Sequence, residues 1–127
     1  MNASQEYLEM QIESASQGQK LIMLHDGLIR FAKIAMKAID DKRYDVASEN
    51  LKYAQNIALH LRSSLVHDHT PDLTGNLDTL YSYWYILLTR ANIDKSIEPL
   101  HELIPLVKQM RDTWDTLEKQ LIQEGNG

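Results

Sequence analysis

The chain has 127 residues, a formal net charge of -5 and no cysteine. This length predicts one domain, residues 1–127, with a core of its own, and the lack of cysteine excludes disulfides, thiolate zinc sites and a cysteine nucleophile. The acidic balance disfavours nucleic acid as a partner, because phosphate groups are bound by basic surfaces. The start has no signal-peptide pattern, and no apolar run approaches the roughly 20 residues that cross a bilayer. We therefore expect a cytoplasmic protein without membrane insertion.

Four apolar stripes with alternating steps of three and four residues predict four amphipathic helices. Four such faces on linked helices predict an all-α, antiparallel up-down four-helix bundle, preceded by a short N-terminal capping segment. Because the interior is used for packing, we expect the surface to carry the function. The stripes are Leu21, Leu24, Leu28, Phe31, Ala35 and Ala38; Ala47, Leu51, Ala54, Ala58, Leu61 and Leu65; Leu73, Leu77, Leu80, Trp84, Leu87 and Ala91; and Leu100, Leu103, Val107, Met110, Trp114, Leu117 and Leu121.

Local chemistry places the ends of these helices. Ser16 and Gln19 have the spacing of a capping box, which predicts the start of the first helix. Pro71 and its polar neighbours predict the longest internal connection, and Pro99 is compatible with the first turn of the fourth helix. The expected helices cover about 16–40, 46–65, 73–91 and 97–123, with connections at 40–45, 66–72 and 92–96.

Two residues break the rules of a regular helix. Gly27 lies in the middle of the first helix, where glycine costs about 1 kcal/mol relative to alanine, and we expect it where another helix packs closely. Pro105 removes an amide donor inside the fourth helix and clashes with the preceding turn. We predict a kink between Glu102 and Pro105.

No polar constellation predicts an enzyme or a bound cofactor. Glu98 and His101 form one Glu-x-x-His pair, but a di-metal bundle needs a second pair and the sequence has none. The run 67–69, His-Asp-His, reads as a solvated loop, because loop ligands without a rigid shell hold metal poorly. The alternative to a binding protein is a histidine phosphotransfer or adaptor bundle, with His25 as the exposed phosphoryl acceptor, although no lysine stands three residues downstream.

The third helix has more aromatic residues than its core stripe can use. Tyr81, Tyr83, Tyr85, Ile86 and Leu88 surround that stripe and cannot all point inward, because successive helical residues rotate by about 100°. Tyrosine is favoured at interfaces, where its ring is covered and its hydroxyl stays accessible. We therefore predict a binding groove beside the second, third and fourth helices.

The segment before the first helix also carries apolar residues. Tyr7, Leu8, Met10 and Ile12 are too few to form an independent element. We expect residues 1–15 to be a mobile segment that rests reversibly over the groove, with simple disorder as the alternative.

The stretch 12–31, IESASQGQKLIMLHDGLIRF, resembles the signature of the flagellin export chaperones, the FliS family, in which a cap leads into a helix reading roughly LIxMLYDGxIxF. The resemblance covers about Tyr7 to Leu121 and all four helices. Gln17 stands where the family usually has proline, and His25 where it usually has tyrosine. Further matching stretches are NLKYAQNI at 50–57, NLDTLYSYWY at 76–85, RAN at 90–92 and RDTW at 111–114.

This resemblance implies a non-enzymatic cytoplasmic chaperone that binds the disordered C-terminal segment of flagellin, prevents premature polymerisation and delivers the subunit to the flagellar type III export gate. Export-gate components, a co-chaperone and an anti-sigma factor are further expected partners, and self-association through the apolar surface is an additional expectation. The implied flagellin-binding residues are Tyr7, Asn50, Tyr53, Ala54, Ile57, Tyr81, Tyr83, Trp84, Leu87, Leu103, Val107 and Met110.

Overall fold

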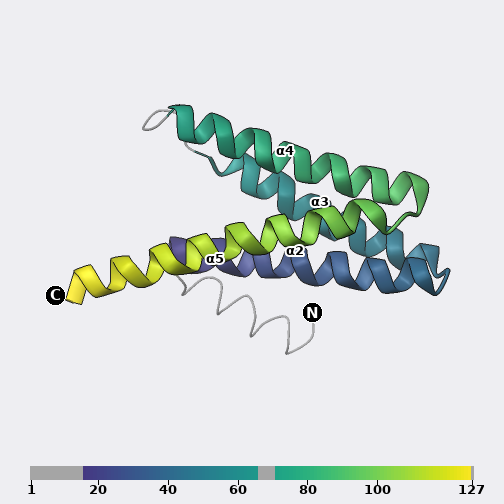
Figure 1. Ribbon diagram of the computed structural model, residues 1–127, viewed down its shortest axis with the longest axis horizontal. Coiled ribbons are helices and arrows are strands. Elements are labelled where there is room, and N and C mark those ends of the chain that lie inside the picture. The colour runs from purple at the N-terminus through teal and green to yellow at the C-terminus, as the bar shows by residue number, and fades with distance from the viewer. Residues whose placement is uncertain (1–15, 66–70, 127) are drawn as a thin grey trace, which may run out of the picture.

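The computed structural model describes residues 16–65 and 71–126, which form four antiparallel helices (Figure 1). Helix α2 packs against α3 and α5, and α4 packs against the same two helices, so the helices follow one another around the core. This arrangement confirms the predicted all-α four-helix bundle. The helices are α2, Gln17–Asp40; α3, Tyr44–Ser63; α4, Pro71–Asp94; and α5, Glu98–Asn126.

The observed helix ends differ from the predicted ones by a few residues. Pro71 begins α4 although the sequence reading placed it in the connection, because a first helical residue needs no amide donor. Helix α5 begins at Glu98 and continues unbroken through Pro105 to Asn126, so the kink at Pro105 stays a prediction. No described helix is both long and apolar enough to cross a membrane.

The start of α2 is held by the predicted capping box and by a contact with α5. The Gln19 amide donates to Ser16 Oγ at 3.1 Å, and the Ser16 amide donates to Gln19 Oε1 at 3.0 Å. Ser16 Oγ in turn donates to Glu118 Oε1 at 2.7 Å. The point where the chain enters α2 is therefore tied to the C-terminal half of α5.

Two lysines end helices in the left-handed backbone conformation. Lys42 has φ 59° after α2, and Lys95 has φ 49° after α4. At the first of these ends the Arg43 amide donates to the Ala38 carbonyl at 2.8 Å and the Lys42 amide to the Ile39 carbonyl at 3.0 Å. This pair of bonds is the Schellman motif, in which glycine is the usual residue at the left-handed position.

The core lies between the four helices, and the buried face of α2 agrees only in part with the predicted stripe. His25, Ala32 and Ile39 are buried, whereas Leu21, Leu24 and Phe31 of the predicted stripe are only half-buried. Leu28, Ala35 and Ala38 of the predicted stripe are buried as expected, so the buried face includes part of that stripe and the positions next to it. At the added position His25, Tyr81 and Trp84 of α4 pack against the imidazole ring. The predicted stripe of α3 is buried from Ala47 to Leu61, as expected.

Several residues that carry the family resemblance connect neighbouring helices. Asp26 of α2 accepts from Arg111 Nε of α5 at 2.9 Å. A Cβ atom at Gly27 would lie 3.2 Å from Ile57 Cδ1 of α3, so α2 and α3 do approach closely at this glycine. Asn92 Oδ1 of α4 accepts from Ser48 Oγ of α3 at 2.9 Å.

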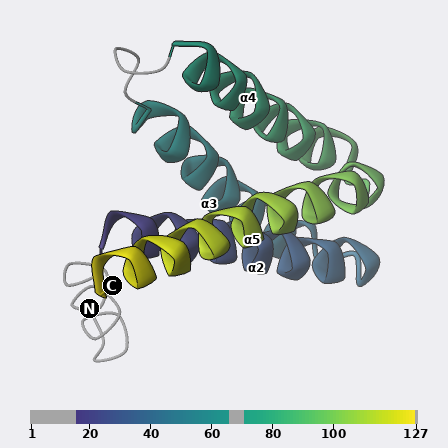
Figure 2. The same ribbon diagram turned by 60° about the vertical axis from the view of Figure 1, so that its left-hand side comes forward.

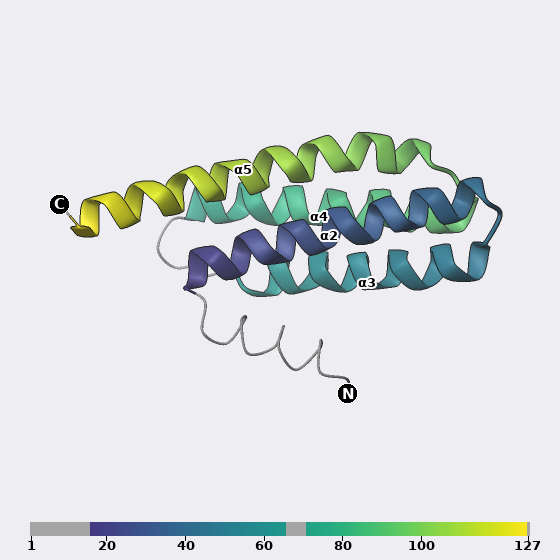
Figure 3. The same ribbon diagram turned by 90° about the horizontal axis from the view of Figure 1, so that it is seen from below.

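The bundle is more open at one end than at the other. Helix α4 diverges from α5 toward the N-terminal end of α4 (Figure 2). The C-terminal end of α5 extends beyond the other helices (Figure 3). Apolar residues at this end therefore have fewer neighbours than the same heptad positions at the closed end.

Candidate partner-binding surface

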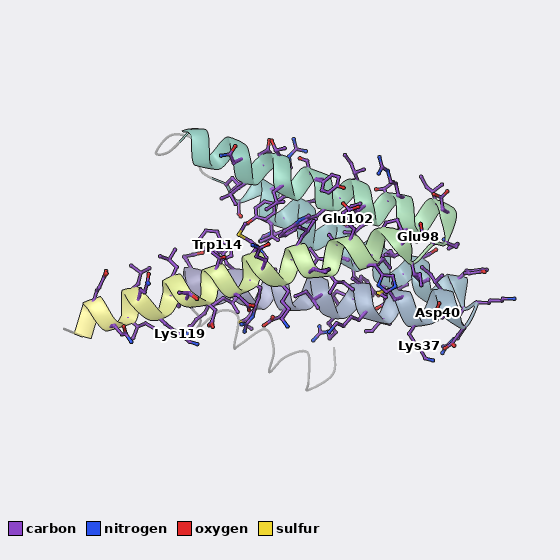
Figure 4. The ribbon with its side chains drawn as sticks, in the orientation of Figure 1. Lys37, Asp40, Glu98, Glu102, Trp114 and Lys119 are labelled. Atoms are coloured by element: carbon purple, nitrogen blue, oxygen red, sulfur yellow. The ribbon has the colours of Figure 1, made fainter. Side chains whose placement is uncertain are left out.

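The divergence of α4 and α5 leaves an apolar depression between them, which we call the α4–α5 groove. It has a volume of about 250 Å³ and is lined by Leu80 of α4 and by Leu106, Gln109, Met110 and Thr113 of α5. The three apolar residues are half-buried. In Figure 4, Glu102 lies where α4 and α5 are close, and Trp114 lies where they have separated.

The groove continues along α5 toward the C-terminal end. An adjoining depression of about 500 Å³ shares Gln109 and Thr113 with it and adds Leu117. Leu117, Leu121 and Ile122 are 41%, 55% and 49% exposed. The sequence placed Leu117 and Leu121 in the core, and this was wrong because α5 runs past the helices that could cover them. We call these three residues the α5 overhang.

A tyrosine and a glutamate bridge the two helices beside the groove. The Tyr83 hydroxyl donates to Glu102 Oε2. This hydrogen bond raises the pKa of Tyr83 above its ordinary value, because the bond would be lost with the proton. The pair holds α4 to α5 where the two helices are close.

Buried polar rings lie beneath the groove. His25 Nδ1 lies 2.6 Å from the Leu21 carbonyl oxygen, so in the neutral ring Nδ1–H donates to that carbonyl. His25 Nε2, Trp84 Nε1 and Trp114 Nε1 are buried without hydrogen-bond partners among the described residues. Burial raises the pKa of Tyr81 and lowers that of His25.

The burial of His25 overturns its prediction as an exposed phosphoryl acceptor. Its side chain has an exposed fraction of 0%. A phosphoryl donor cannot reach either ring nitrogen without opening the bundle. The error is local, because His25 takes the inward position that was predicted for Leu24, which is half-buried.

A second apolar surface lies between α2 and α3, and we call it the α2–α3 strip. The rings of Phe31 and Tyr53 are 5.2 Å apart between centroids, and half-buried Ile57 packs against Gly27 nearby. Tyr53 is 43% exposed, and its hydroxyl donates to Glu49 Oε1 at 2.7 Å. The hydrogen bond to Glu49 raises the pKa of Tyr53. Tyr53 and Ile57 therefore belong to a different surface from Tyr83 and Met110.

The predicted flagellin-binding residues thus divide between the core and two surfaces, and their role in binding stays a prediction. Tyr53 and Ile57 lie on the α2–α3 strip, Met110 lines the α4–α5 groove and Tyr83 flanks it. Tyr7 lies outside the described residues. The remaining seven are buried and would contact a partner only if the helices moved apart: Asn50, Ala54, Tyr81, Trp84, Leu87, Leu103 and Val107.

Sequence reasoning missed Leu106, Ile122 and the exposure of Leu117 and Leu121. A usable signal existed, because the apolar stripe of the fourth helix is longer than any other stripe in the chain. If one apolar stripe is longer than the stripes that pack against it, part of its length stays uncovered.

The candidate metal ligands do not converge in the described part of the chain. Glu98 and His101 are both exposed, and residues 16–65 and 71–126 contain no group of three His, Cys, Asp or Glu side chains that could hold a metal ion. The run 67–69 lies outside the described residues.

The described residues form an all-helical bundle with two partly uncovered apolar surfaces, and such surfaces are typical of proteins that bind other chains. Comparison with known proteins makes this class specific. The family "Flagellar protein FliS" matches residues 1–121. The flagellar secretion chaperone FliS of Bacillus subtilis (strain 168) is 32% identical over 117 residues, which cover 92% of this chain and 84% of the relative.

Two further relatives carry the same description. The flagellar secretion chaperone FliS of Escherichia coli (strain K12) is 32% identical over 92% of this chain and 88% of its own length. That of Vibrio cholerae serotype O1 is 27% identical over 87% of this chain and 81% of its own length. The chain belongs to the FliS family of flagellar secretion chaperones, and it is not an enzyme.

Proposed function

We propose that this protein is a cytoplasmic chaperone of flagellar type III secretion that binds the disordered C-terminal segment of flagellin, prevents its premature polymerisation and delivers it for export. The observation that carries this proposal is the α4–α5 groove with its continuation onto the α5 overhang. A disordered amphipathic segment can lay apolar side chains into such a groove and gain helical order as it binds. Its polymerising face is then covered.

The size and chemistry of the surface support a peptide rather than a small molecule. Both depressions are open. The α4–α5 groove is lined mainly by leucine and methionine, whereas the adjoining depression is lined by Leu117 and by polar residues of α5: Gln109, Asp112, Thr113, Thr116 and Gln120. Small-molecule sites are instead enclosed clefts that bury most of the ligand. A helix or extended chain is the occupant that such a shallow, long surface fits.

We further propose that residues 1–15 act as a reversible cover for this surface. The supporting observation is the hydrogen bond between Ser16 and Glu118, which starts the segment beside the α5 overhang. Apolar Tyr7, Leu8, Met10 and Ile12 lie within reach of the overhang from that point. The client would then displace the segment when it binds.

Calorimetric titration with the C-terminal segment of flagellin from the same organism tests the proposal. We expect one-to-one binding with a large negative heat-capacity change, which indicates burial of apolar surface and coupled folding. Deletion of residues 1–15 should tighten binding if the segment competes with the client. Absence of heat and of co-elution would exclude flagellin as the client.

A matched pair of charge insertions locates the binding site. Leu117→Glu places a charge on the overhang, and Leu59→Glu places one on α3 outside it, and the two leucines are 41% and 43% exposed. Both variants should fold, because neither buries the new carboxylate. We expect Leu117→Glu to weaken binding by about tenfold or more and Leu59→Glu to leave it within about twofold. Equal losses of affinity in the two variants would show that the α5 overhang is not part of the binding site.

A further inference from the structure

At the opposite end of the molecule from the α5 overhang, the surface over the α2–α3 turn has an apolar floor and a basic rim. A depression of about 310 Å³ is lined by Ile34, Ala38 and Val46, with Lys33, Lys37, Arg43 and Asp41 around it. Ile34 is 40% exposed although it is a large aliphatic residue. Lys37 and Lys119, labelled in Figure 4, show how far apart the two ends of the molecule lie. We call this depression the basic depression.

The charge of this region is opposite to that of the rest of the chain. Residues 30–46 contain five basic and three acidic side chains, a net charge of +2. The whole chain carries -5, so the remaining residues carry -7. The protein therefore has a strong charge asymmetry, and its positive pole coincides with an exposed aliphatic surface.

The basic side chains at the rim are largely free to meet a partner. Lys37 Nζ lies 3.4 Å from Asp41 Oδ1, a long and exposed ion pair that contributes little. Lys33 and Arg43 are exposed and make no ion pair with the described residues. Three basic side chains thus surround the aliphatic floor, and the single carboxylate among them, that of Asp41, makes only the long ion pair with Lys37.

From this geometry we infer that the basic depression is a docking site for an acidic, aliphatic peptide segment of another protein. Leucine or isoleucine side chains of the partner pack on exposed Ile34 and half-buried Val46, with Ala38 buried beneath them, and its carboxylates pair with Lys33, Lys37 and Arg43. Charge complementarity selects this partner, because a basic or neutral apolar segment would leave the three cations unpaired or repelled. The inference concerns a surface separate from the α4–α5 groove, so both sites can be occupied at once.

Fluorescence anisotropy with a labelled synthetic helical peptide of leucine and glutamate tests the inference on the full-length protein. The same peptide with lysine in place of glutamate is the matched probe. We expect saturable binding of the glutamate peptide, weakening with added salt, and no binding of the lysine peptide. Equal binding of both peptides, or of neither, would overturn the inference.

Charge-reversed variants locate the site on the protein. The double variant Lys33→Glu/Arg43→Glu should weaken binding by about tenfold or more at low ionic strength. The control Lys52→Glu/Lys119→Glu changes the net charge equally at exposed lysines away from the depression and should change affinity by less than about twofold. Equal losses in the two variants would mean that only overall charge attracts the peptide, which would overturn the site.

Two further measurements test whether the apolar floor contributes to binding beyond charge, and whether the ligand is a peptide rather than a lipid surface. Ile34→Gln keeps every charge, and we expect it to weaken binding of the glutamate peptide by about threefold or more. Vesicles of phosphatidylglycerol should not compete with the peptide for the wild-type protein, and competition would point to a lipid surface instead. Flagellin-segment binding should persist in Lys33→Glu/Arg43→Glu, so failure of this site and failure of the proposed function are distinguishable.

Discussion

At the scale of single residues, His25 of α2 places a titratable ring in the core, against the rings of Tyr81 and Trp84 of α4. Desolvation by burial lowers its pKa, and this outweighs the opposing effects of the Leu21 carbonyl and of Asp26. Tyr81 and Trp84 of α4 face the ring, and Asp26 turns outward to Arg111 of α5. A proton on His25 therefore meets no neutralising partner in the core.

The direction of the pH dependence follows from this burial. In the unfolded chain the histidine has its ordinary pKa of about 6.5. As the pH falls below that value, the unfolded chain takes up a proton that the folded chain resists, so the free energy of unfolding decreases. The stabilising contribution is complete above about pH 6.5 and is lost as the pH falls toward the lowered pKa of the folded state.

Replacing His25 by phenylalanine tests this account. We expect the urea midpoint of the wild type to fall between about pH 7.5 and about pH 5.5, and the fall to be smaller in His25→Phe. Near pH 7.5 the variant should differ from the wild type by about 1 kcal/mol or less, because one hydrogen bond and one unpaired nitrogen are removed together. His60→Phe, at an exposed position, is the control and should keep the wild-type pH dependence. Identical pH profiles for the wild type and His25→Phe would contradict the assignment.

At the scale of elements, the two lysines in left-handed backbone conformation should respond differently to glycine. The change Lys42→Gly removes a Cβ atom that is unfavourable at φ 59°, so we expect a gain of about 0.5 to 1 kcal/mol in the free energy of unfolding. Lys95→Gly relieves the same backbone conformation but loses the Nζ hydrogen bonds to Ser48 Oγ and to Asn92 Oδ1, at 2.8 and 2.6 Å. We expect no gain there.

Urea unfolding of the two variants at neutral pH measures this difference. The control Lys42→Ala keeps the Cβ atom and should leave stability within about 0.5 kcal/mol of the wild type. An equal gain in Lys42→Gly and Lys95→Gly would mean that the Lys95 bridge between α3 and α4 contributes nothing.

The elements also show how far the sequence could predict the structure. The stripe of α3 is buried from Ala47 to Leu61 as predicted, whereas its last residue, Leu65, lies beyond the end of α3 and is half-buried. In α2 the pairs Leu24/His25 and Phe31/Ala32 offer two adjacent faces, and neighbouring helices decide between them: rings of α4 pack against His25, and Phe31 packs on Tyr53 of α3. The periodicity of one helix does not show which side chains a neighbouring helix contributes to the core.

The candidate site was predicted less well than the fold for a related reason. The aromatic excess on the third helix indicated a binding surface, yet Tyr81 and Trp84 turned out to be 1% and 0% exposed. Which end of a stripe stays uncovered depends on the relative lengths and divergence of the helices. The sequence therefore indicated that an apolar surface exists but did not locate it on the C-terminal half of α5.

At the scale of the whole molecule, the core that stabilises the bundle and the α5 overhang that we propose binds the client are separate regions. Helix α5 has 29 residues and α2 has 24, and the extra length carries Leu121 and Ile122 past the start of α2. The Ser16–Glu118 hydrogen bond joins α5 to the start of α2, and residues 119–125 beyond it are all exposed. Residues beyond it contribute little to the core.

Deleting residues 120–127 should therefore separate stability from binding. The deletion keeps Glu118 and its bond to Ser16 but removes Leu121 and Ile122, which are about half exposed in the free protein. We expect the free energy of unfolding to fall by less than about 1 kcal/mol, while the affinity for the flagellin segment falls by about tenfold or more. Urea unfolding and calorimetric titration of the same sample measure the two quantities. Deleting only residues 124–127 retains both apolar side chains and should change neither, and unchanged affinity after the longer deletion would place the client elsewhere on the bundle.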